Sequence, residues 1–247
     1  MNIKEKIIFR EKKILKQFFN NCFDIPSLPN WINKKKINFW NKNNFNLHYL
    51  PKISLKKKLN LRSWKDKPSN FLYKKIKEGT IKKEAINLPG KWLLIDSRDK
   101  PKKRVLWIQS KEVDFLKKFN LNPKKFFEKW SKQQYYNDFL MPVLKEKGNN
   151  SRFCLTIYEI KKLNSFITDF LKVKNKKIRL PYFIEYNYLG NAIYNQWKKT
   201  KTWEWLEDKL KNGQHLASGY QSTGIIGFDP PNFWSTILSF RPVIEIT

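Results

Sequence analysis

The stretch KTWEWLEDKL at residues 201–210 places two tryptophans around one glutamate, in a chain crowded with lysine. On a strand, Trp203 and Trp205 would point to one face and Glu204 to the other, because successive side chains alternate. Two buried indoles would remove roughly 150–250 Å² each from water. A buried Glu204 would then need a cationic or hydrogen-bonding partner. The stretch therefore predicts a strand with an aromatic face and a paired carboxylate.

Three landmarks surround this stretch: RLPYFIEYNYLG from residue 179, the turn-rich HLASGYQSTG at 215–224, and SFRPVIEI at 239–246. Their order and spacing resemble the formylglycine-generating, or sulfatase-modifying-factor, family over about residues 150–247, and at most 88–247. The combination of GKWLLID, RLP, WEW and FRP is also similar to uncharacterised bacterial proteins. The matching positions are Arg179, Leu180, Pro181, Glu185, Tyr186, Tyr188, Trp203, Glu204, Trp205, Asp208, Phe240 and Arg241.

The resemblance implies an α+β architecture, with a C-type-lectin-like domain over residues 88–247 built from a mostly antiparallel sheet, helices and long loops. Arginine can hold a carboxylate through two parallel hydrogen bonds. We therefore predict a buried pair between Arg241 and either Glu204 or Glu185. We interpret Glu207 and Asp208 as a solvated helix edge or a turn.

The catalytic residues of this family are missing. In the family that the chain resembles, active members bind copper through cysteines of the C-terminal region. Iron-dependent relatives bind their metal through several histidines. This chain has no cysteine after Cys154, and its only histidines are His48 and His215, too few for a facial triad. We expect a non-catalytic domain without cofactor or metal. A diverged enzyme is a third alternative, which would require a well-formed pocket with a perturbed titratable group.

The resemblance also implies that ligands meet the loops between the last strands, within residues 215–236. Tyrosine, tryptophan and amide side chains provide adaptable contacts there at modest ordering cost. Our first hypothesis is a binding module that recognises an unknown protein or small ligand through these loops, although they could also simply close the core. The candidate binding residues are Tyr220, Gln221, Asp229, Asn232, Phe233 and Trp234.

Positive charge concentrates in the first part of the chain. The net charge is +30, and residues 1–87 hold 22 Lys and Arg against 6 Asp and Glu, whereas residues 180–247 hold six of each kind. We predict a basic, partly helical N-terminal extension over residues 1–87, with an amphipathic helix over 3–19. A general compositional bias toward lysine could produce the same excess.

This extension suggests the alternative function, a nucleic-acid-associated protein that binds RNA or DNA through residues 1–87. Embedded aromatic side chains could stack on bases, or they could pack on the neighbouring domain, which is the alternative we favour. No clear period is visible over residues 31–70. The aromatic residues concerned are Trp31, Phe39, Trp40, Phe45 and Tyr49.

The remaining signals concern local structure and location. Thr156 and Glu159 have capping-box spacing, which predicts a helix beginning there. Strands are predicted at 91–95 and 104–109, helices across 111–147, and short strands and turns after 177. Cys22 and Cys154 form no disulfide framework. No signal-peptide core or apolar run of about 18 residues occurs, so we expect a soluble, cytoplasmic protein without a membrane span.

Overall fold

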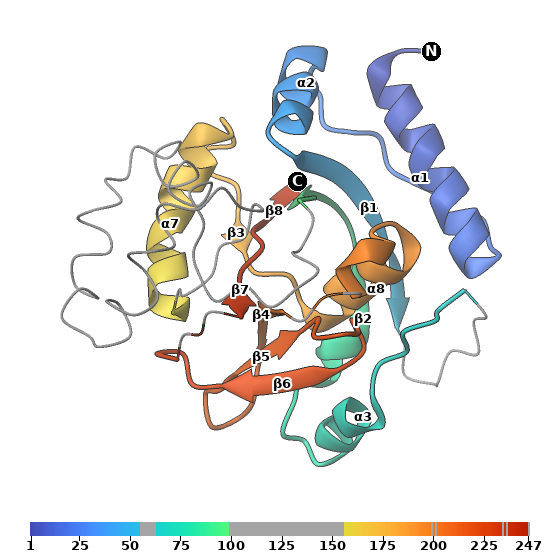
Figure 1. Cartoon of the computed structure of the whole chain (residues 1–247). Helices are drawn as coiled ribbons and strands as arrows, with labels where there is room; N and C mark the ends of the chain where they lie inside the picture. Colours follow the sequence, from blue (N-terminus) through green and yellow to red (C-terminus); the bar gives the residue numbers. More distant parts are fainter. Residues whose placement is uncertain are drawn as a thin grey trace.

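The chain forms a mixed α+β structure (Figure 1). The computed structural model describes residues 1–54, 63–98, 156–198, 200, 202–233, 235 and 237–246. Across these ranges lie five α-helices and two four-stranded sheets, which confirms the expected α+β class. The predicted strand at 104–109, the predicted helices across 111–147, and Cys154 fall outside the described residues.

The elements follow one another in this order: α1 (Ile3–Phe19), α2 (Lys34–Lys42), β1 (Phe45–Ser54), α3 (Asn70–Lys77), the 3₁₀-helix η1 (Lys83–Ile86), β2 (Asn87–Asp96), α7 (Ile157–Phe170), β3 (Ile178–Arg179), α8 (Phe183–Ala192), the 3₁₀-helix η3 (Asn195–Lys198), β4 (Trp203–Lys209), β5 (His215–Ser218), β6 (Ile226–Asp229), β7 (Leu238–Ser239) and β8 (Val243–Ile246). Of the helices that the structure describes, none has the length and apolar content needed to cross a bilayer.

The first sheet unites distant parts of the chain. Its strand order is β1-β2-β8-β3, and all of its pairs are antiparallel. β1 pairs with β2 along its whole length, from Phe45 opposite Asp96 to Ser54 opposite Asn87. Residues 45–54, which the charge pattern assigns to the extension, thus form one sheet with residues 243–246.

The second sheet carries the tryptophan-rich stretch. Its order is β6-β5-β4-β7, and only the β4–β7 pair is parallel. The stretch quoted first forms β4, as its alternation predicts, and the predicted strand at 91–95 lies inside β2. The helix predicted to begin at Thr156 is also present, and α7 begins at the next residue.

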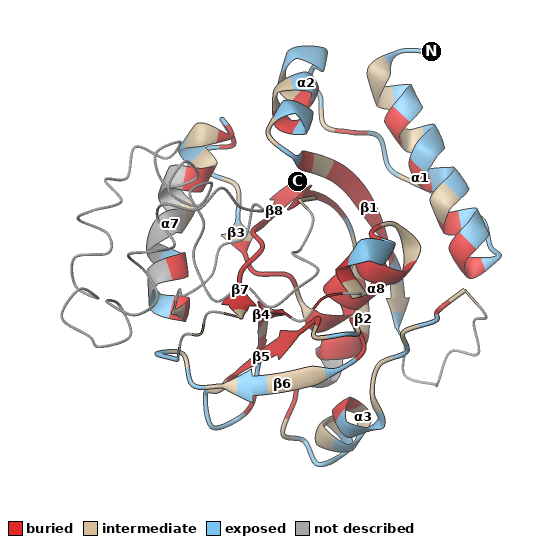
Figure 2. Ribbon diagram, in the orientation of Figure 1, coloured by how far each residue is buried: buried red, intermediate tan, exposed pale blue. Residues whose placement is uncertain are grey.

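Helix α1 spans residues 3–19, as predicted, and packs against the rest of the molecule (Figure 2). Asn2 and Glu5 form a capping box: the Asn2 side chain accepts from the Glu5 N–H at 3.0 Å, and the Glu5 carboxylate accepts from the Asn2 N–H at 2.7 Å. The apolar stripe that includes Leu15 and Phe18 is buried. The lysines on the opposite side remain in water.

A buried polar chain completes this contact. Glu11, on the inner face of α1, accepts from the Tyr49 N–H at 3.2 Å, and its carboxylate lies 3.2 Å from His48 Nδ1. His48 Nε2 lies 2.7 Å from the Tyr194 hydroxyl. Burial acts to raise the pKa of Glu11, but His48 and Arg10 outweigh it and hold that pKa below its ordinary value.

Most aromatic side chains of residues 31–49 pack inward. Trp40, Phe45 and Tyr49 are buried, which confirms the packing alternative for these three, whereas Trp31 and Phe39 are half-buried. The aperiodic segment nevertheless forms α2 and β1. α2 is only nine residues long, and its start is set by a cap in which the Asn33 side chain accepts from the Lys36 N–H at 3.0 Å.

Short strands follow residue 177 as predicted, from β3 to β8. The exception is helix α8, which covers residues 183–192. Its residues from Phe183 to Asn191 are all buried. A helix covered on every side has no polar stripe, so its sequence shows no helical period. At Gly190 a Cβ atom would lie 2.5 Å from Thr223 Cγ2, so a side chain there would force α8 and the residue 223 turn apart.

Candidate functional site

The predicted arginine–carboxylate pair forms between Arg241 and Glu204. Arg241 Nε donates to Glu204 Oε2 at 2.9 Å, and Arg241 Nη2 donates to Oε1 at 2.8 Å. Both residues are buried, and Arg241 Nη1 also donates to the Asp96 carbonyl. Burial acts to lower the pKa of Arg241, but Glu204 and Asp96 raise it above its usual value. The pair joins β4 to the end of β2.

Glu185 pairs instead with the arginine of the RLP motif. Arg179 Nη1 and Nη2 donate to the Glu185 carboxylate at 2.7 and 2.8 Å. Arg179 Nε donates to Glu245 Oε1 at 2.8 Å. One guanidinium therefore connects β3, the first turn of α8 and β8. The remaining landmark residues Leu180, Tyr186, Tyr188 and Phe240 are buried, and Pro181 is buried beside them.

The two tryptophans of the opening stretch differ in burial. Trp205 is 0% exposed, whereas Trp203 is half-buried and stacks on Tyr220 with ring centroids 5.5 Å apart. The prediction of two buried indoles is therefore correct for Trp205 and wrong for Trp203. The Trp203 ring lies over Gly227, where a Cβ would approach Trp203 Cζ3 to 3.3 Å.

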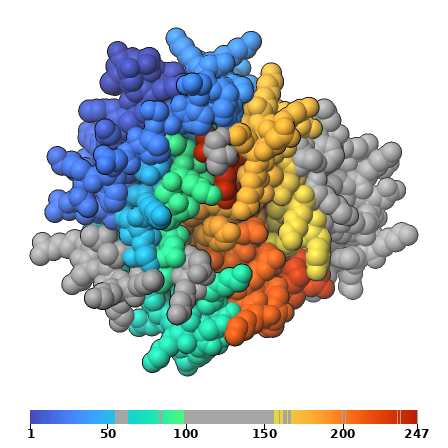
Figure 3. Space-filling model, turned by 180° about the vertical axis from the view of Figure 1, so that it is seen from behind, coloured from blue at the N-terminus to red at the C-terminus, as the bar shows by residue number. Residues whose placement is uncertain are grey.

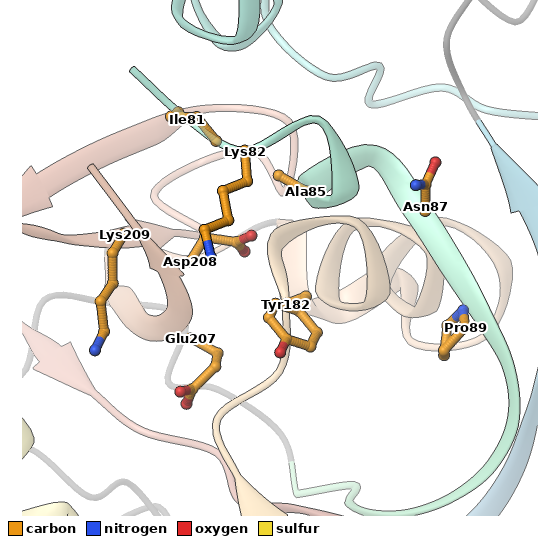
Figure 4. A pocket seen from close by; sticks show the side chains of 9 residues that line it. All are labelled: Ile81, Lys82, Ala85, Asn87, Pro89, Tyr182, Glu207, Asp208 and Lys209. Carbon is orange, nitrogen blue, oxygen red and sulfur yellow. The ribbon is translucent and has the colours of Figure 1, made fainter. Parts of the chain in front are cut away.

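A pocket of about 570 Å³ opens at the far end of β4 from Trp203 (Figure 4). Three segments converge on it: residues 81–89, which include η1 and the start of β2, the residue before α8, and the last residues of β4. The lining residues are Ile81, Lys82, Ala85, Asn87, Pro89, Tyr182, Glu207, Asp208 and Lys209.

Asp208 is the most perturbed group of this pocket. It is 7% exposed, and its Oδ2 accepts from the Phe183 N–H at 2.5 Å, at the start of α8. Burial raises the pKa of Asp208 to about 7, with a further increase from Glu185 and Glu207 that the Phe183 N–H and Arg179 oppose. The interpretation of Glu207 and Asp208 as a solvated helix edge or turn is wrong, because both lie on β4 and Asp208 is buried.

The other polar lining groups surround Asp208 with both signs of charge. The Glu207 carboxylate accepts from the Leu180 N–H at 3.3 Å. Lys82 and Lys209 are exposed. Tyr182 is half-buried, and the Arg179 Cζ atom lies 4.4 Å from the centroid of its phenol ring. Burial raises the pKa of Tyr182, so its hydroxyl stays protonated and can donate a hydrogen bond at neutral pH.

From the raised pKa of Asp208 we predict that the folded protein loses stability as pH rises. The pKa of the Asp208 carboxyl is near its ordinary value of 3.8 in the unfolded chain and about 7 in the folded one, so between these values only the folded state keeps the proton. The unfolding free energy should therefore fall through this range and level off above pH 7. At about 1.4 kcal/mol for each unit of pKa, the full loss is about 4 kcal/mol.

Urea titrations of the wild type and Asp208→Asn at pH 4 to 8 measure this loss. We expect the difference in stability between the two proteins to move by about 4 kcal/mol in favour of the variant as pH rises. Parallel stability curves for the two proteins would show that Asp208 ionises normally in the folded state.

The described members of the predicted loop set lie at both ends of β6. Tyr220 and Gln221 precede β6 and Asp229 ends it, so the strand separates them by about 10 Å at 3.3 Å per residue. The Gln221 N–H donates to the Thr200 carbonyl at 2.6 Å. Asn232 and Phe233 are exposed, and Trp234 lies outside the described residues. None of the described members of this set lines the pocket.

The sequence drew attention to Asp208 and Glu207 but assigned neither to a pocket, and it gave no indication of the other lining residues. They come from segments about 100 residues apart, and nothing within either segment indicates that they meet. The one local signal is the spacing of Tyr182 and Glu185, whose carboxylate accepts from the Tyr182 N–H at 2.8 Å. That bond marks the start of a helix at the pocket wall.

Metal ligation and known relatives add no further assignment. Within the described ranges, no three His, Cys, Asp or Glu side chains group closely enough to hold a metal ion. Comparisons with protein-family models, with curated proteins and with solved structures gave no match.

Proposed function

We propose that this chain is a non-catalytic binding module with a sulfatase-modifying-factor-like, C-type-lectin-like fold, whose pocket takes a small zwitterionic ligand of the amino-acid or short-peptide class. The observation that carries the proposal is the pocket itself, which is lined by two carboxylates, Asp208 and Glu207, and by two lysines, Lys82 and Lys209. Support for the fold comes from the landmark residues, because they form two buried ion pairs, Arg179–Glu185 and Arg241–Glu204.

The acidic pair is suited to an ammonium group. Burial is the largest cause of the raised pKa of Asp208, and repulsion from Glu185 and Glu207 adds to it against the opposing Phe183 N–H and Arg179. A cation placed there would relieve that repulsion and form charge-assisted hydrogen bonds with the carboxylate. Such a ligand favours the ionised acid, so its affinity should increase as pH rises through about 7.

The rest of the lining is suited to a carboxylate and an apolar side chain. Lys82 and Lys209 provide mobile cationic groups that can pair with the ligand carboxylate. Ile81, Ala85 and Pro89 supply apolar surface on the η1 and β2 side. A volume of about 570 Å³ lies in the range of small-molecule sites, roughly 300–1,000 Å³.

A ligand panel tests this proposal. Thermal shifts and calorimetry of the wild type at pH 8 would use free L-amino acids and dipeptides, with butylamine and butyrate as ligands that carry one charged group. We expect the zwitterions to bind more tightly than either single-charge analogue. Asp208→Asn should weaken their binding about tenfold or more, since a hydrogen bond to a charged group contributes about 1.5–3 kcal/mol.

Asp229→Asn is the matched control, because it removes the same charge from a residue at the end of β6, outside the pocket. We expect this variant to bind like the wild type. Loss of binding in Asp229→Asn with retention in Asp208→Asn would instead favour the loop surface at residues 215–236. Absence of binding by every zwitterion at pH 8 would refute the pocket assignment.

The pocket also supplies what a diverged enzyme would require, a cavity with a perturbed carboxyl group. We assign Asp208 to binding because its Oδ2 is already held by the Phe183 N–H and its neighbours are charges of both signs. Following each bound ligand by chromatography over hours would detect any turnover.

A further inference from the structure

A second feature lies on the outer side of helix α1, where lysines surround an exposed aromatic ring. An α-helix has about 3.6 residues per turn, so successive side chains are rotated by about 100° around its axis. Phe9 is 62% exposed, and the side chains of the helix within about 60° of it are all exposed as well. We call this surface the outer face of α1 and define it by Glu5, Lys6, Phe9, Lys12, Lys13 and Lys16.

The contacts on the inner side of α1 keep this face in water. Arg10 Nη2 donates to the Leu47 carbonyl at 2.5 Å, and the Glu11 carboxylate accepts from the Tyr49 N–H at 3.2 Å. Both bonds join α1 to β1, and turning Phe9 inward would break them. In Figure 1 the helix lies at the edge of the molecule, and Figure 3 shows its dark-blue atoms at the edge from behind as well. The outer face is therefore a fixed and accessible surface.

This face combines positive charge with an apolar ring. It contains four lysines and one acid, Glu5, whose carboxylate also accepts from the Asn2 N–H. Phe9 lies at the centre of these lysines, on the opposite side of the helix from the buried Phe18. Its ring therefore adds nothing to the core and remains available to a partner.

One kind of partner matches both properties. Clusters of roughly four to eight basic residues on a helix are typical of binding to anionic lipids, and stable anchoring takes an apolar group in addition to the charge. A bilayer offers phosphate and carboxylate groups to the lysines and an apolar interior to Phe9. A nucleic-acid duplex offers the lysines its phosphates but leaves the ring in water, because its bases are stacked inside.

We propose that the outer face of α1 docks the folded protein onto an anionic phospholipid bilayer. The helix lies along the membrane surface, its lysines pair with lipid headgroups, and Phe9 enters the boundary between the headgroups and the acyl chains. The assignment does not depend on the pocket, whose lining residues belong to other segments.

Co-sedimentation of the full chain with phosphatidylcholine vesicles, with and without phosphatidylserine, tests this proposal. We expect binding only to the anionic vesicles, and weaker binding as salt rises. Lys13→Gln/Lys16→Gln should lower the affinity about thirtyfold, because each lysine near such a surface contributes about 1 kcal/mol. The control pair is Lys77→Gln/Lys211→Gln, which removes two exposed charges from α3 and from the turn after β4. This pair should change the affinity little.

Insertion of the ring has its own signature. Phe9→Ala should lower the affinity about tenfold at every salt concentration, because most of the apolar surface that enters the bilayer is lost. Phe9→Leu should keep most of the affinity. All of these positions are exposed, so urea titrations should show that each variant is as stable as the wild type.

A net charge of +30 attracts any polyanion, so the test depends on where the effects are located. Equal losses in the two lysine pairs, or a Phe9→Ala variant that binds vesicles like the wild type, would overturn the proposal. Duplex DNA and oligothymidylate provide the second comparison. If their binding depends on Phe9 and on the Lys13/Lys16 pair while vesicle binding does not, this face belongs to nucleic acid and the proposal is wrong.

Discussion

Replacing Arg241 with methionine is expected to cost about 3–5 kcal/mol of unfolding free energy, the usual loss when one partner of a buried ion pair is removed. The substitution leaves the Glu204 carboxylate buried without the two donors that now lie 2.8 and 2.9 Å from it. It also removes the donor to the Asp96 carbonyl. Urea denaturation at neutral pH, followed by tryptophan fluorescence, measures the loss.

A second variant separates the unpaired charge from lost packing. Arg241→Met/Glu204→Leu removes both charges, and we expect it to recover most of the stability lost in the single variant, since apolar replacements of a buried pair are often neutral. The control is Lys12→Met, at an exposed position of α1, whose unfolding free energy should stay within about 0.5 kcal/mol of the wild-type value. A single variant as stable as Lys12→Met, or a double variant less stable than the single one, would contradict the structural role of this pair.

A chain that begins at residue 88 is expected not to fold. It would lack β1, which pairs with β2 from Asn87 to Asp96, and would leave the inner strand of a sheet as an unprotected edge. It would also lack Phe18 and Trp64, which cover α8. Their ring centroids lie 5.2 and 6.3 Å from that of Tyr188 in this helix. We expect no near-ultraviolet circular dichroism and no cooperative urea transition from this fragment.

Mixing the fragment with residues 1–87 provides the control. If the two parts form one core, the mixture should regain a cooperative transition that neither fragment shows alone. A cooperative transition and native spectrum for residues 88–247 alone would show instead that residues 1–87 are a separable extension, as the charge pattern predicts.

The sequence predicts elements whose environment is asymmetric. Helix α1 has a buried stripe that includes Leu15 and Phe18 beside exposed lysines, so its period is visible and its bounds are correct. Strand β4 is recognisable from Trp203, Glu204 and Trp205 because alternation at period 2 separates the indoles from the carboxylate. A pair between Arg241 and either Glu204 or Glu185 was predictable because a buried glutamate needs a cationic or hydrogen-bonding partner, and the structure shows Glu204 as that partner.

Symmetric environments and long-range contacts are not visible in the sequence. Helix α8 is buried all round, and β1 is buried on both faces over Leu47–Leu50, so neither shows a polar face. The charge pattern suggests a domain boundary near residue 87. Charged side chains lie mainly on the surface, however, so their distribution does not show that β1 belongs to the shared core. The pocket brings residues 81–89 to the end of β4, and Asp208 owes its raised pKa to that burial.

The most direct test of the central claim, that a buried acid in this pocket receives a ligand ammonium group, is a carbon-13 NMR titration of the Asp208 carboxyl group. The resonance can be assigned by its absence in Asp208→Asn. We predict a midpoint at about pH 7 in the free protein, and a lower midpoint when a zwitterionic ligand from the panel is bound. A midpoint near pH 4 that no ligand changes would contradict the account.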